Sequence, residues 1–384
     1  MPPQRSSGLF THHPFKFLYT TFFLAALPLR LFTILTASIL PATRPKRTFQ
    51  QAIATKLIKL WFRFATTVEY RTTKSLEAGK DKDHFVLLDP DDIPHSHDST
   101  YGGVLGVNLA IRPTKLAAFW YNAPPPPDTV PELVVLHFHG GAFVMGGARP
   151  AEAGWGPSAL SKRLNCPVLL PQYRLSNAID RTTAFPAALQ DAVTAYTYLL
   201  YIIGVKSGNI VLSGDSAGGN LVLALLRYLE HGQGQRERAL PPPRAALLWG
   251  PWVDPSVPGR EIDANRNVST DFIFGDLGDW GARCYLPDGW DSDHEIYSYI
   301  SPLGHELPTD VPVFIQTSTA EVLHDSHRQF SRNMEEKGCR LKYVEFDNAP
   351  HDTFMGAPFM GFLKEQEDAI DQAAEFVLEA AAPA

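Results

Sequence analysis

A serine flanked by glycines follows an apolar, strand-like run near the middle of the chain. The run NIVLSG at residues 209–214 leads into Gly214-Asp215-Ser216-Ala217-Gly218, and the helix-like LVLALLRYLE comes after it. A GxSxG sequence between a strand and a helix is typical of a nucleophile elbow, in which a strained turn exposes the serine hydroxyl. We therefore predict that Ser216 is a nucleophile and that Gly214, Asp215 and Gly218 support its turn.

A second glycine-rich turn stands upstream of this serine, at the end of another apolar run. LVVLHFH at residues 133–139 ends in His139-Gly140-Gly141, and a diglycine allows backbone N–H groups to converge on one point. Acyl transfer needs such donors where the oxyanion forms, and loss of one donor lowers the rate by about 10²–10³-fold. We therefore expect an oxyanion hole formed by the N–H groups of Gly140, Gly141 and Ala217, with His139 orienting the turn.

Taken together, the motifs resemble those of the hormone-sensitive-lipase-like α/β-hydrolases, a branch that includes arylacetamide deacetylases and microbial carboxylesterases. HGGAF at residues 139–143 and GDSAGGN at residues 214–220 carry the resemblance, with HGGA where the family usually has HGGG. The supporting segments are YRL at 173–175, FPAA at 185–188 with Asp191, GPWVD at 250–254 and SPL at 301–303. The resemblance implies an α/β-hydrolase fold and serine hydrolase chemistry, with neither a metal nor a cofactor.

In such a fold the acid and the base follow the serine along the chain. His351 stands in DNAPHDTF, directly after the last strand-like run, at the position of the family's general base. Glu321 stands where the family usually has an aspartate, and either carboxylate can orient a histidine. The resemblance therefore implies a triad of Ser216, His351 and Glu321. Asp325 is the alternative acid, and its other interpretation is the N-cap of a helix.

Strand-like and helix-like segments alternate along the body of the chain. The strand-like runs are 116–122, 133–139, 167–173, 209–214, 245–250, 311–317 and 341–347, and the helix-like segments include 185–201, 218–231 and 325–337. The alternation predicts an α/β fold with a mostly parallel sheet and helices on both faces. Residues 255–300 interrupt this rhythm, and we expect them to form a cap together with the N-terminal arm.

Charge is distributed unevenly over the 384 residues, which are 45% hydrophobic and carry a net charge of -7. Residues 1–80 contain twelve basic and two acidic side chains, a net charge of +10, and residues 81–384 carry a net charge of -17. We infer a basic membrane-associating or cap segment at 1–80 and an α/β-hydrolase catalytic domain at 81–384. The acidic body excludes broad nucleic-acid binding, which needs a basic face.

An apolar run in the N-terminal arm predicts membrane association. Residues 17–40 are long enough to span a bilayer as a helix. Pro28 and Arg30 lie near the centre, where a proline bends a helix and a charge costs about 3 kcal/mol, so a re-entrant or interfacial helix pair is an alternative. A signal peptide is a further alternative, although no A-x-A cleavage site follows the run.

The segment after this run has the pattern of an amphipathic helix. Lys56, Lys59 and Arg63 recur at helical spacing, which predicts either a basic helix on an anionic membrane or a cap helix packed on the domain. We expect the protein to contact a membrane, such as the endoplasmic reticulum, through residues 17–66. Basic residues after the apolar run favour a cytosolic body, whereas the sequon at Asn267 favours a lumenal one, so the topology stays open.

Three functions fit these residues. The first is a carboxylesterase or acetylesterase that cleaves acetyl or short-acyl esters of an apolar small molecule, such as a secondary metabolite. The second uses the same triad for a lyase, cyclisation or condensation step. The third is a non-catalytic small-molecule receptor, like the gibberellin receptors that resemble this branch, but those usually lack a triad member.

We expect the first function, because Ser216, Glu321 and His351 are all present. Phe143, Trp155 and Trp252 are candidates for lining an apolar substrate pocket, although aromatic side chains more often pack in a core. The sequence does not identify the ester or the oligomeric state.

Overall fold

A single eight-stranded sheet forms the centre of the protein. The computed structural model describes residues 8–40, 46–71, 74–93, 100–122, 124–126, 128–233, 240–288 and 295–380. The strand order is β1-β2-β4-β3-β5-β6-β7-β8. The strands are β1 (Phe85–Leu88), β2 (Leu116–Tyr121), β3 (Val134–Phe138), β4 (Val168–Pro171), β5 (Ile210–Asp215), β6 (Ala245–Trp249), β7 (Val313–Ser318) and β8 (Leu341–Phe346).

Most neighbouring strands of the sheet run parallel. Parallel pairing connects β4 through β3, β5, β6 and β7 to β8, whereas β2 is antiparallel to both β1 and β4. The expected α/β fold with a mostly parallel sheet is confirmed. The strand-like runs of the sequence correspond to β2–β8, but β1 was not expected. It is a partly exposed edge strand of four residues, too short to show a periodic pattern.

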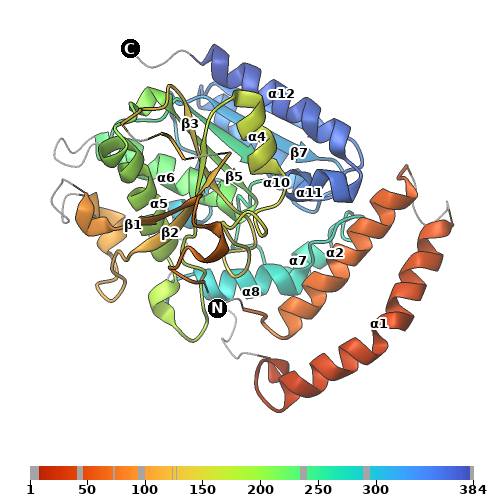
Figure 1. Ribbon diagram of the computed structural model, residues 1–384. Helices are drawn as coiled ribbons and strands as arrows, with labels where there is room; N and C mark the ends of the chain where they lie inside the picture. Colours follow the sequence, from red (N-terminus) through yellow and green to blue (C-terminus); the bar gives the residue numbers. More distant parts are fainter. Residues whose placement is uncertain are drawn as a thin grey trace.

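Helices cover both faces of this sheet (Figure 1). The helices of the body are α4 (Gly156–Leu164), α5 (Ala187–Thr197), α6 (Ala217–Gln233), α10 (His324–Glu336), α11 (Thr353–Met360) and α12 (Leu363–Glu379). Buried side chains of α5, α6 and α10 form one hydrophobic cluster with Leu136 of β3, and those of α4, α11 and α12 form another with Val135. Successive strand residues point to opposite faces, so strands buried on both sides read as continuous apolar runs.

Two segments that are distant in the sequence form a cap over the body. One contributes α2 (Phe49–Thr67), and the other contributes α7 (Gly259–Asp263), α8 (Gly275–Tyr285) and α9 (Tyr297–Ile300). Helix α2 packs beside α8 and α11 and lies between the body and α1 (Phe15–Ile39) (Figure 1). Both segments therefore take part in the cap as expected, although residues 289–294 lie outside the described residues.

Basic side chains of α2 are engaged inside the protein. Lys59 Nζ donates to the carbonyl oxygen of Asp271 at 2.9 Å and to that of Val268. Lys56 Nζ donates to Ser38 Oγ of α1 at 3.2 Å. The second interpretation of this segment, a cap helix packed on the domain, is the one that the structure adopts. The interpretation as a basic helix on an anionic membrane surface stays a prediction.

Helix α1 presents an apolar face away from the protein. Its inward face places Tyr19, Phe23 and Leu27 against α2, and the Arg30 guanidinium lies 4.9 Å from the ring centroid of Phe23. Its outward face is apolar, with Phe22 62% exposed. The helix continues through Pro28 as one bent helix, so the alternative of a helix pair is not observed (Figure 1). By length and composition it is the one described helix that could cross a membrane, a test that a signal sequence also passes.

The glycosylation sequon does not reach the surface. Asn267 is 9% exposed, and its Nδ2 atom donates to the carbonyl oxygens of Thr319 at 2.9 Å and Glu321 at 2.8 Å. A side-chain amide held by two buried acceptors is not free to carry a glycan in the folded protein. Asn267 therefore gives no support to a lumenal catalytic domain.

Candidate active site

Ser216 lies in a strained turn between β5 and α6. Its φ is +49°, in the left-handed region that residues other than glycine rarely adopt. A Cβ on Gly214 would lie 2.3 Å from the carbonyl oxygen of Gly218, and a Cβ on Gly218 would lie 1.9 Å from that of Phe138. Only glycine fits at these two positions, so the turn has the geometry of a nucleophile elbow.

His351 and Glu321 extend from Ser216 in an unbroken hydrogen-bonded line. The Nε2 atom of His351 lies 2.8 Å from Ser216 Oγ, and its Nδ1 atom lies 2.7 Å from Glu321 Oε2. Because an ionised carboxylate only accepts, Nδ1 carries the proton and Nε2 is available to receive the serine proton. Glu321 follows β7 and His351 follows β8, and each is 1% exposed. The structure thus brings together the three residues that the sequence singled out.

Asp325, the alternative acid, is held on the surface. The Nη2 atom of Arg266 donates to Asp325 Oδ1 at 2.8 Å, and the Asp325 side chain is 54% exposed. This hydrogen bond and the Arg266 charge lower the pKa of Asp325. The N-cap residue of α10 is Leu323, so Asp325 does not cap the helix either. Of the two candidate acids, the structure brings Glu321 and not Asp325 to the His351 ring.

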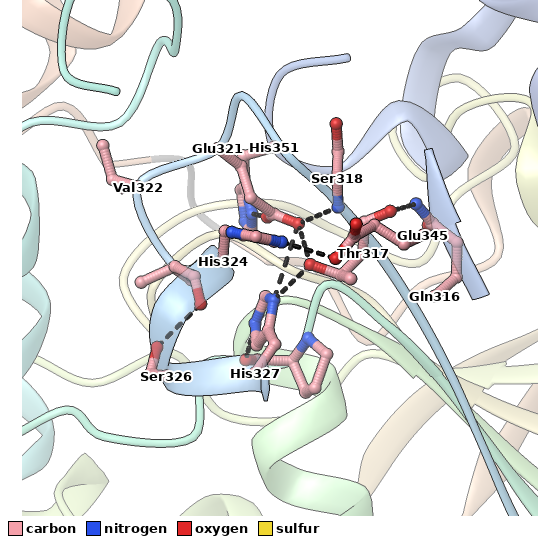
Figure 2. Close-up of polar contacts among 12 residues, drawn as sticks. Gln316, Thr317, Ser318, Glu321, Val322, His324, Ser326, His327, Glu345 and His351 are labelled. Atoms are coloured by element: carbon pink, nitrogen blue, oxygen red, sulfur yellow. Dashed lines mark hydrogen bonds and ion pairs between the residues drawn. The ribbon is translucent and has the colours of Figure 1, made fainter. Parts of the chain in front are cut away.

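The second oxygen of Glu321 has its own support (Figure 2). Glu321 Oε1 accepts a hydrogen bond from the Ser318 N–H at 2.7 Å and another from the Thr317 hydroxyl at 2.6 Å. His327 Nδ1 lies 2.7 Å from the same hydroxyl, and His327 Nε2 donates to the carbonyl oxygen of Pro251 at 2.7 Å. The carboxylate is therefore fixed from both sides before any substrate binds.

These contacts keep Glu321 ionised. Burial raises the pKa of Glu321, but the charges and hydrogen bonds of His327 and His351 outweigh burial and bring the pKa well below its ordinary value. Sequence reasoning missed Thr317 and His327. The histidine lies one helical turn inside α10, and no local pattern distinguishes it from a surface histidine.

The base itself is buried among carboxylates. Burial lowers the pKa of His351, but the hydrogen bond and charge of Glu321, together with the charges of Asp271 and Asp352, raise it to about 9. Stabilisation of the imidazolium by a neighbouring carboxylate is what a general base needs while it holds the serine proton.

In the turn after β3, the expectation that Gly140 donates to the oxyanion is wrong. The Gly140 N–H donates to Asp215 Oδ2 at 2.7 Å, so Gly140 supports a buried carboxylate and is not a free donor. Within the described part of the chain, the N–H groups of Gly141 and Ala142 have no protein acceptor. The N–H of Ala217 opens α6 and has no acceptor inside the helix. The backbone N–H groups that remain available to bind an oxyanion are therefore those of Gly141, Ala142 and Ala217.

His139, which is predicted to orient the turn, is hydrogen-bonded to the backbone of that turn. Its Nδ1 atom donates to the carbonyl oxygen of Gly140 at 2.7 Å, and its ring stacks on Tyr173 with centroids 4.4 Å apart. Burial lowers the pKa of His139 to about 3, so the imidazole is neutral. A neutral ring bonded to the backbone of the turn positions the loop and does not act as a base.

Asp215 connects the elbow to both neighbouring loops. Its Oδ1 atom lies 3.0 Å from His137 Nε2, and burial raises the pKa of Asp215 to about 6. Burial and the charge of Asp215 raise the pKa of Asp352 well above its ordinary value, and the two carboxyl groups are hydrogen-bonded to each other. Asp352 directly follows His351 in the chain, so the carboxyl pair ties the serine turn to the histidine turn.

A mostly apolar cavity of about 440 Å³ opens beside Ser216 and His351. Helix α2 contributes Trp61 and Phe62 to its lining, and the insertion contributes Phe272 and Leu277. Of the three expected aromatic residues, only Trp252 lines this cavity.

Phe143 and Trp155 pack in the core instead. The ring of Phe143 stacks on Tyr285 with centroids 3.7 Å apart, and Trp155 packs in the hydrophobic cluster on the α12 side of the sheet. The left-handed backbone of Ala142 and Phe143 turns the Phe143 ring inward, a feature that residue type alone does not reveal.

Sequence comparison relates the chain to known hydrolases. Residues 135–355 match a family described as having the alpha/beta hydrolase fold. An acetyl-hydrolase of Streptomyces hygroscopicus is 31% identical over 217 residues, covering 56% of this chain and 67% of that protein. An ethyl acetate hydrolase of Pseudomonas putida is 26% identical over 250 residues, covering 63% of this chain and 72% of that protein.

Solved structures give the same relationship. The crystal structure of an esterase from the bacterial hormone-sensitive lipase family has a TM-score of 0.57 and 25% identity, covering 91% of this chain and 98% of that one. A hyperthermophilic esterase of Pyrobaculum calidifontis has a TM-score of 0.58 at 19% identity, covering 87% of this chain and 94% of that one. At the lower identity the likeness concerns the fold alone.

Proposed function

The chain belongs to the α/β-hydrolase fold family, and from this we propose a carboxylesterase-type serine hydrolase with Ser216 as nucleophile, His351 as base and Glu321 as acid. The observation that carries the proposal is the line of hydrogen bonds from Ser216 Oγ through His351 to Glu321, next to an apolar cavity. Relatives whose names denote ester hydrolysis favour this function over a receptor or a biosynthetic lyase.

The first half of the reaction acylates the serine. His351 Nε2 takes the Ser216 proton while Oγ attacks the ester carbonyl carbon, and the carbonyl electron pair moves to its oxygen. That oxygen is held by the N–H groups of Gly141, Ala142 and Ala217. The bond to the alcohol oxygen then breaks, and His351 gives its proton to the leaving alcohol.

The second half releases the acid. His351 removes a proton from water, the hydroxide attacks the acyl-enzyme carbonyl, and the same N–H groups hold the second oxyanion. Collapse breaks the bond to Ser216 Oγ, and His351 returns the proton to the serine. Glu321 remains ionised throughout and stabilises the imidazolium in both halves.

The cavity favours a small apolar ester. Its volume of about 440 Å³ lies within the range of small-molecule sites, about 300–1,000 Å³. The relatives named acetyl-hydrolase and ethyl acetate hydrolase support an acetyl or other short acyl group. A secondary metabolite that carries such an ester is one proposed substrate.

A panel of p-nitrophenyl esters from acetate to long acyl chains tests the activity. We expect turnover that is highest for the short acyl chains, and stoichiometric labelling of Ser216 by a fluorophosphonate. A second panel of acetylated apolar natural products tests the metabolite hypothesis. No turnover of any ester together with no labelling of Ser216 would sink the hydrolase proposal.

The pH dependence of the reaction follows from the environment of His351. Only the unprotonated ring accepts the serine proton, and the pKa of His351 is raised to about 9. Activity is therefore lost as the pH falls through this raised pKa. We expect kcat/KM for p-nitrophenyl acetate to reach half its maximum well above pH 6.5, the ordinary value for histidine. A half-maximum at or below pH 6.5, after subtraction of spontaneous hydrolysis, would contradict the assignment.

The division between a membrane-facing arm at residues 1–80 and a catalytic domain at 81–384 also stays a proposal. We infer that the arm attaches to a membrane through α1, because α1 turns Arg30 toward α2 and its apolar side outward. Lys56 and Lys59 of α2 make partly buried contacts within the protein, so the proposed membrane segment is α1 rather than all of residues 17–66.

Alkaline carbonate extraction tests this attachment. The full-length protein should stay in the membrane pellet, together with an endoplasmic reticulum marker. A variant with Phe22→Asp and Phe32→Asp on the outward face should move to the soluble fraction, since each charge costs about 2.5–3.5 kcal/mol at a bilayer centre. Thr36→Ser, also outward but uncharged, serves as the control. Release of the unmodified protein by carbonate would refute an integral anchor.

A further inference from the structure

Asp271 lies outside the Ser216–His351–Glu321 line but touches both loops that carry its base and its acid. Its Oδ1 atom accepts the N–H of His351 at 3.0 Å, and its Oδ2 atom accepts the N–H of Val322 at 2.7 Å. Val322 directly follows Glu321 in the chain. The Asp271 side chain is fully buried, so no water competes for these bonds. A carboxylate can serve both loops because each of its oxygens is an acceptor.

The side chain of Asn267, four residues before Asp271, makes a second contact with the acid loop. Asn267 Nδ2 donates to the carbonyl oxygen of Glu321 at 2.8 Å and to that of Thr319 at 2.9 Å. The segment 267–271 therefore holds the acid loop through a side-chain amide and a carboxylate, and it holds His351 through the same carboxylate. No residue of this segment belongs to the hydrogen-bonded line itself.

The opposite side of this segment is bound by the N-terminal arm. Lys59 Nζ of α2 donates to the carbonyl oxygens of Asp271, at 2.9 Å, and Val268. Arg47, just before α2, donates through Nη1 to the carbonyl oxygen of Thr270 at 2.6 Å and through Nε to that of Asn348 at 2.8 Å. Two cations of the arm thus fix the backbone from which Asp271 projects.

The charged groups around Asp271 come from four segments. Arg47 and Lys59 face it from the arm, whereas His351 and Glu321 lie on the side of the catalytic loops. Burial raises the pKa of Asp271 and the His351 charge lowers it, while the Asp271 charge in turn raises the pKa of His351. Loss of the Asp271 charge should therefore lower the pKa of His351.

We propose that Asp271 is a positioning residue through which α2 of the N-terminal arm keeps His351 and Glu321 aligned. The arm then raises the rate of turnover by aligning these two residues, in addition to lining the cavity. This inference rests on the proposed hydrolase function, because its readout is the rate of ester hydrolysis.

A matched pair of lysines on α2 tests the contribution of the arm. Lys59→Met removes the donor to the Asp271 carbonyl and should lower kcat by about 5- to 100-fold, since small misplacements of reacting groups have effects of this size. Lys56→Met is the control, because Lys56 donates to Ser38 of α1 and not to the catalytic domain; its kcat should stay within about twofold of the wild-type value. Lys59→Arg should recover most of the loss, since it retains a donor.

Asp271→Asn tests the carboxylate itself. It should lower kcat and move the acid limb of the pH–rate profile to lower pH, a shift that a purely structural role would not produce. Rates are expressed per site labelled by fluorophosphonate, so unfolded protein does not count. If Asp271→Asn fails to fold, the kcat values of Lys59→Met, Lys59→Arg and the Lys56→Met control test the positioning role instead.

The outcomes separate the two proposals. A wild-type protein without esterase activity would refute the hydrolase function. If the wild type is active, the positioning role of Asp271 would be overturned by two results together. These are a Lys59→Met variant with the wild-type kcat, and a folded Asp271→Asn variant with the wild-type kcat and the wild-type acid limb of the pH–rate profile.

Discussion

Replacing Ser216 by alanine is expected to lower kcat for p-nitrophenyl acetate by about 10⁶-fold, the effect found when a serine nucleophile is removed from a triad. The reason is geometric: Ser216 Oγ is the atom within 2.8 Å of His351 Nε2, and the elbow directs it to the cavity. The residual rate should come from the N–H donors and from substrate binding, which remain in the variant.

A matched serine provides the control for this experiment. Ser298→Ala changes a hydroxyl that donates to the carbonyl oxygen of Glu295 and lies outside the cavity lining, so its rate should equal that of wild type. Stopped-flow or steady-state release of p-nitrophenolate measures both variants, and thermal melting shows that both are folded. A Ser216→Ala enzyme with more than a few per cent of wild-type kcat would show that another group is the nucleophile.

The second large effect is expected at Glu321. Glu321→Gln should lower kcat by about 10⁴-fold, as loss of the orienting carboxylate does in other triads. The glutamine amide has one acceptor oxygen, whereas Glu321 accepts from His351 on one oxygen and from Ser318 and Thr317 on the other. One side must lose its bond, and the imidazolium loses its counter-charge.

Asp325→Asn makes the same chemical change in the alternative acid and serves as its matched control. Asp325 pairs with the exposed Arg266 and lies 3.7 Å from His324 Nδ1, on the protein surface. Exposed ion pairs contribute about 0–1 kcal/mol, so kcat should stay close to wild type. Near-normal activity of Glu321→Gln together with an inactive Asp325→Asn would reverse the assignment of the acid.

Several features of the site could be predicted because each depends on a few adjacent residues. A strand followed by Gly214-Asp215-Ser216 dictates an elbow, since small residues and a forced turn are local requirements. The strand-like runs indicated seven of the eight strands in the described part of the chain. In β2 to β7 every residue is buried, because both faces of these strands are covered, and this makes their sequences mostly apolar. His351 was found from its place directly after the last of these runs.

Other features depend on contacts between segments far apart in the chain. Gly140 was expected to donate to an oxyanion, but its N–H is taken by Asp215, which arrives from another strand. Asn267 matched a glycosylation sequon, but the acid loop buries its amide. His327 supports Glu321 only because α10 places it beside Thr317.

In the N-terminal arm, too, some features follow from the sequence and others depend on tertiary packing. Its length and apolar composition follow from the sequence, and so does the helical spacing of Lys56 and Lys59. The direction in which each side chain points was decided by tertiary packing: Arg30 faces α2, and Lys59 binds the backbone of Asp271.

The local turns, the strands and the residue types available for acyl transfer therefore follow from short stretches of sequence. Which N–H groups remain free, which carboxylate reaches His351 and how the arm contacts the catalytic loops depend on the fold, because a hydrogen bond needs both partners within about 3 Å. For partners that the chain separates by tens or hundreds of residues, only the fold sets that distance.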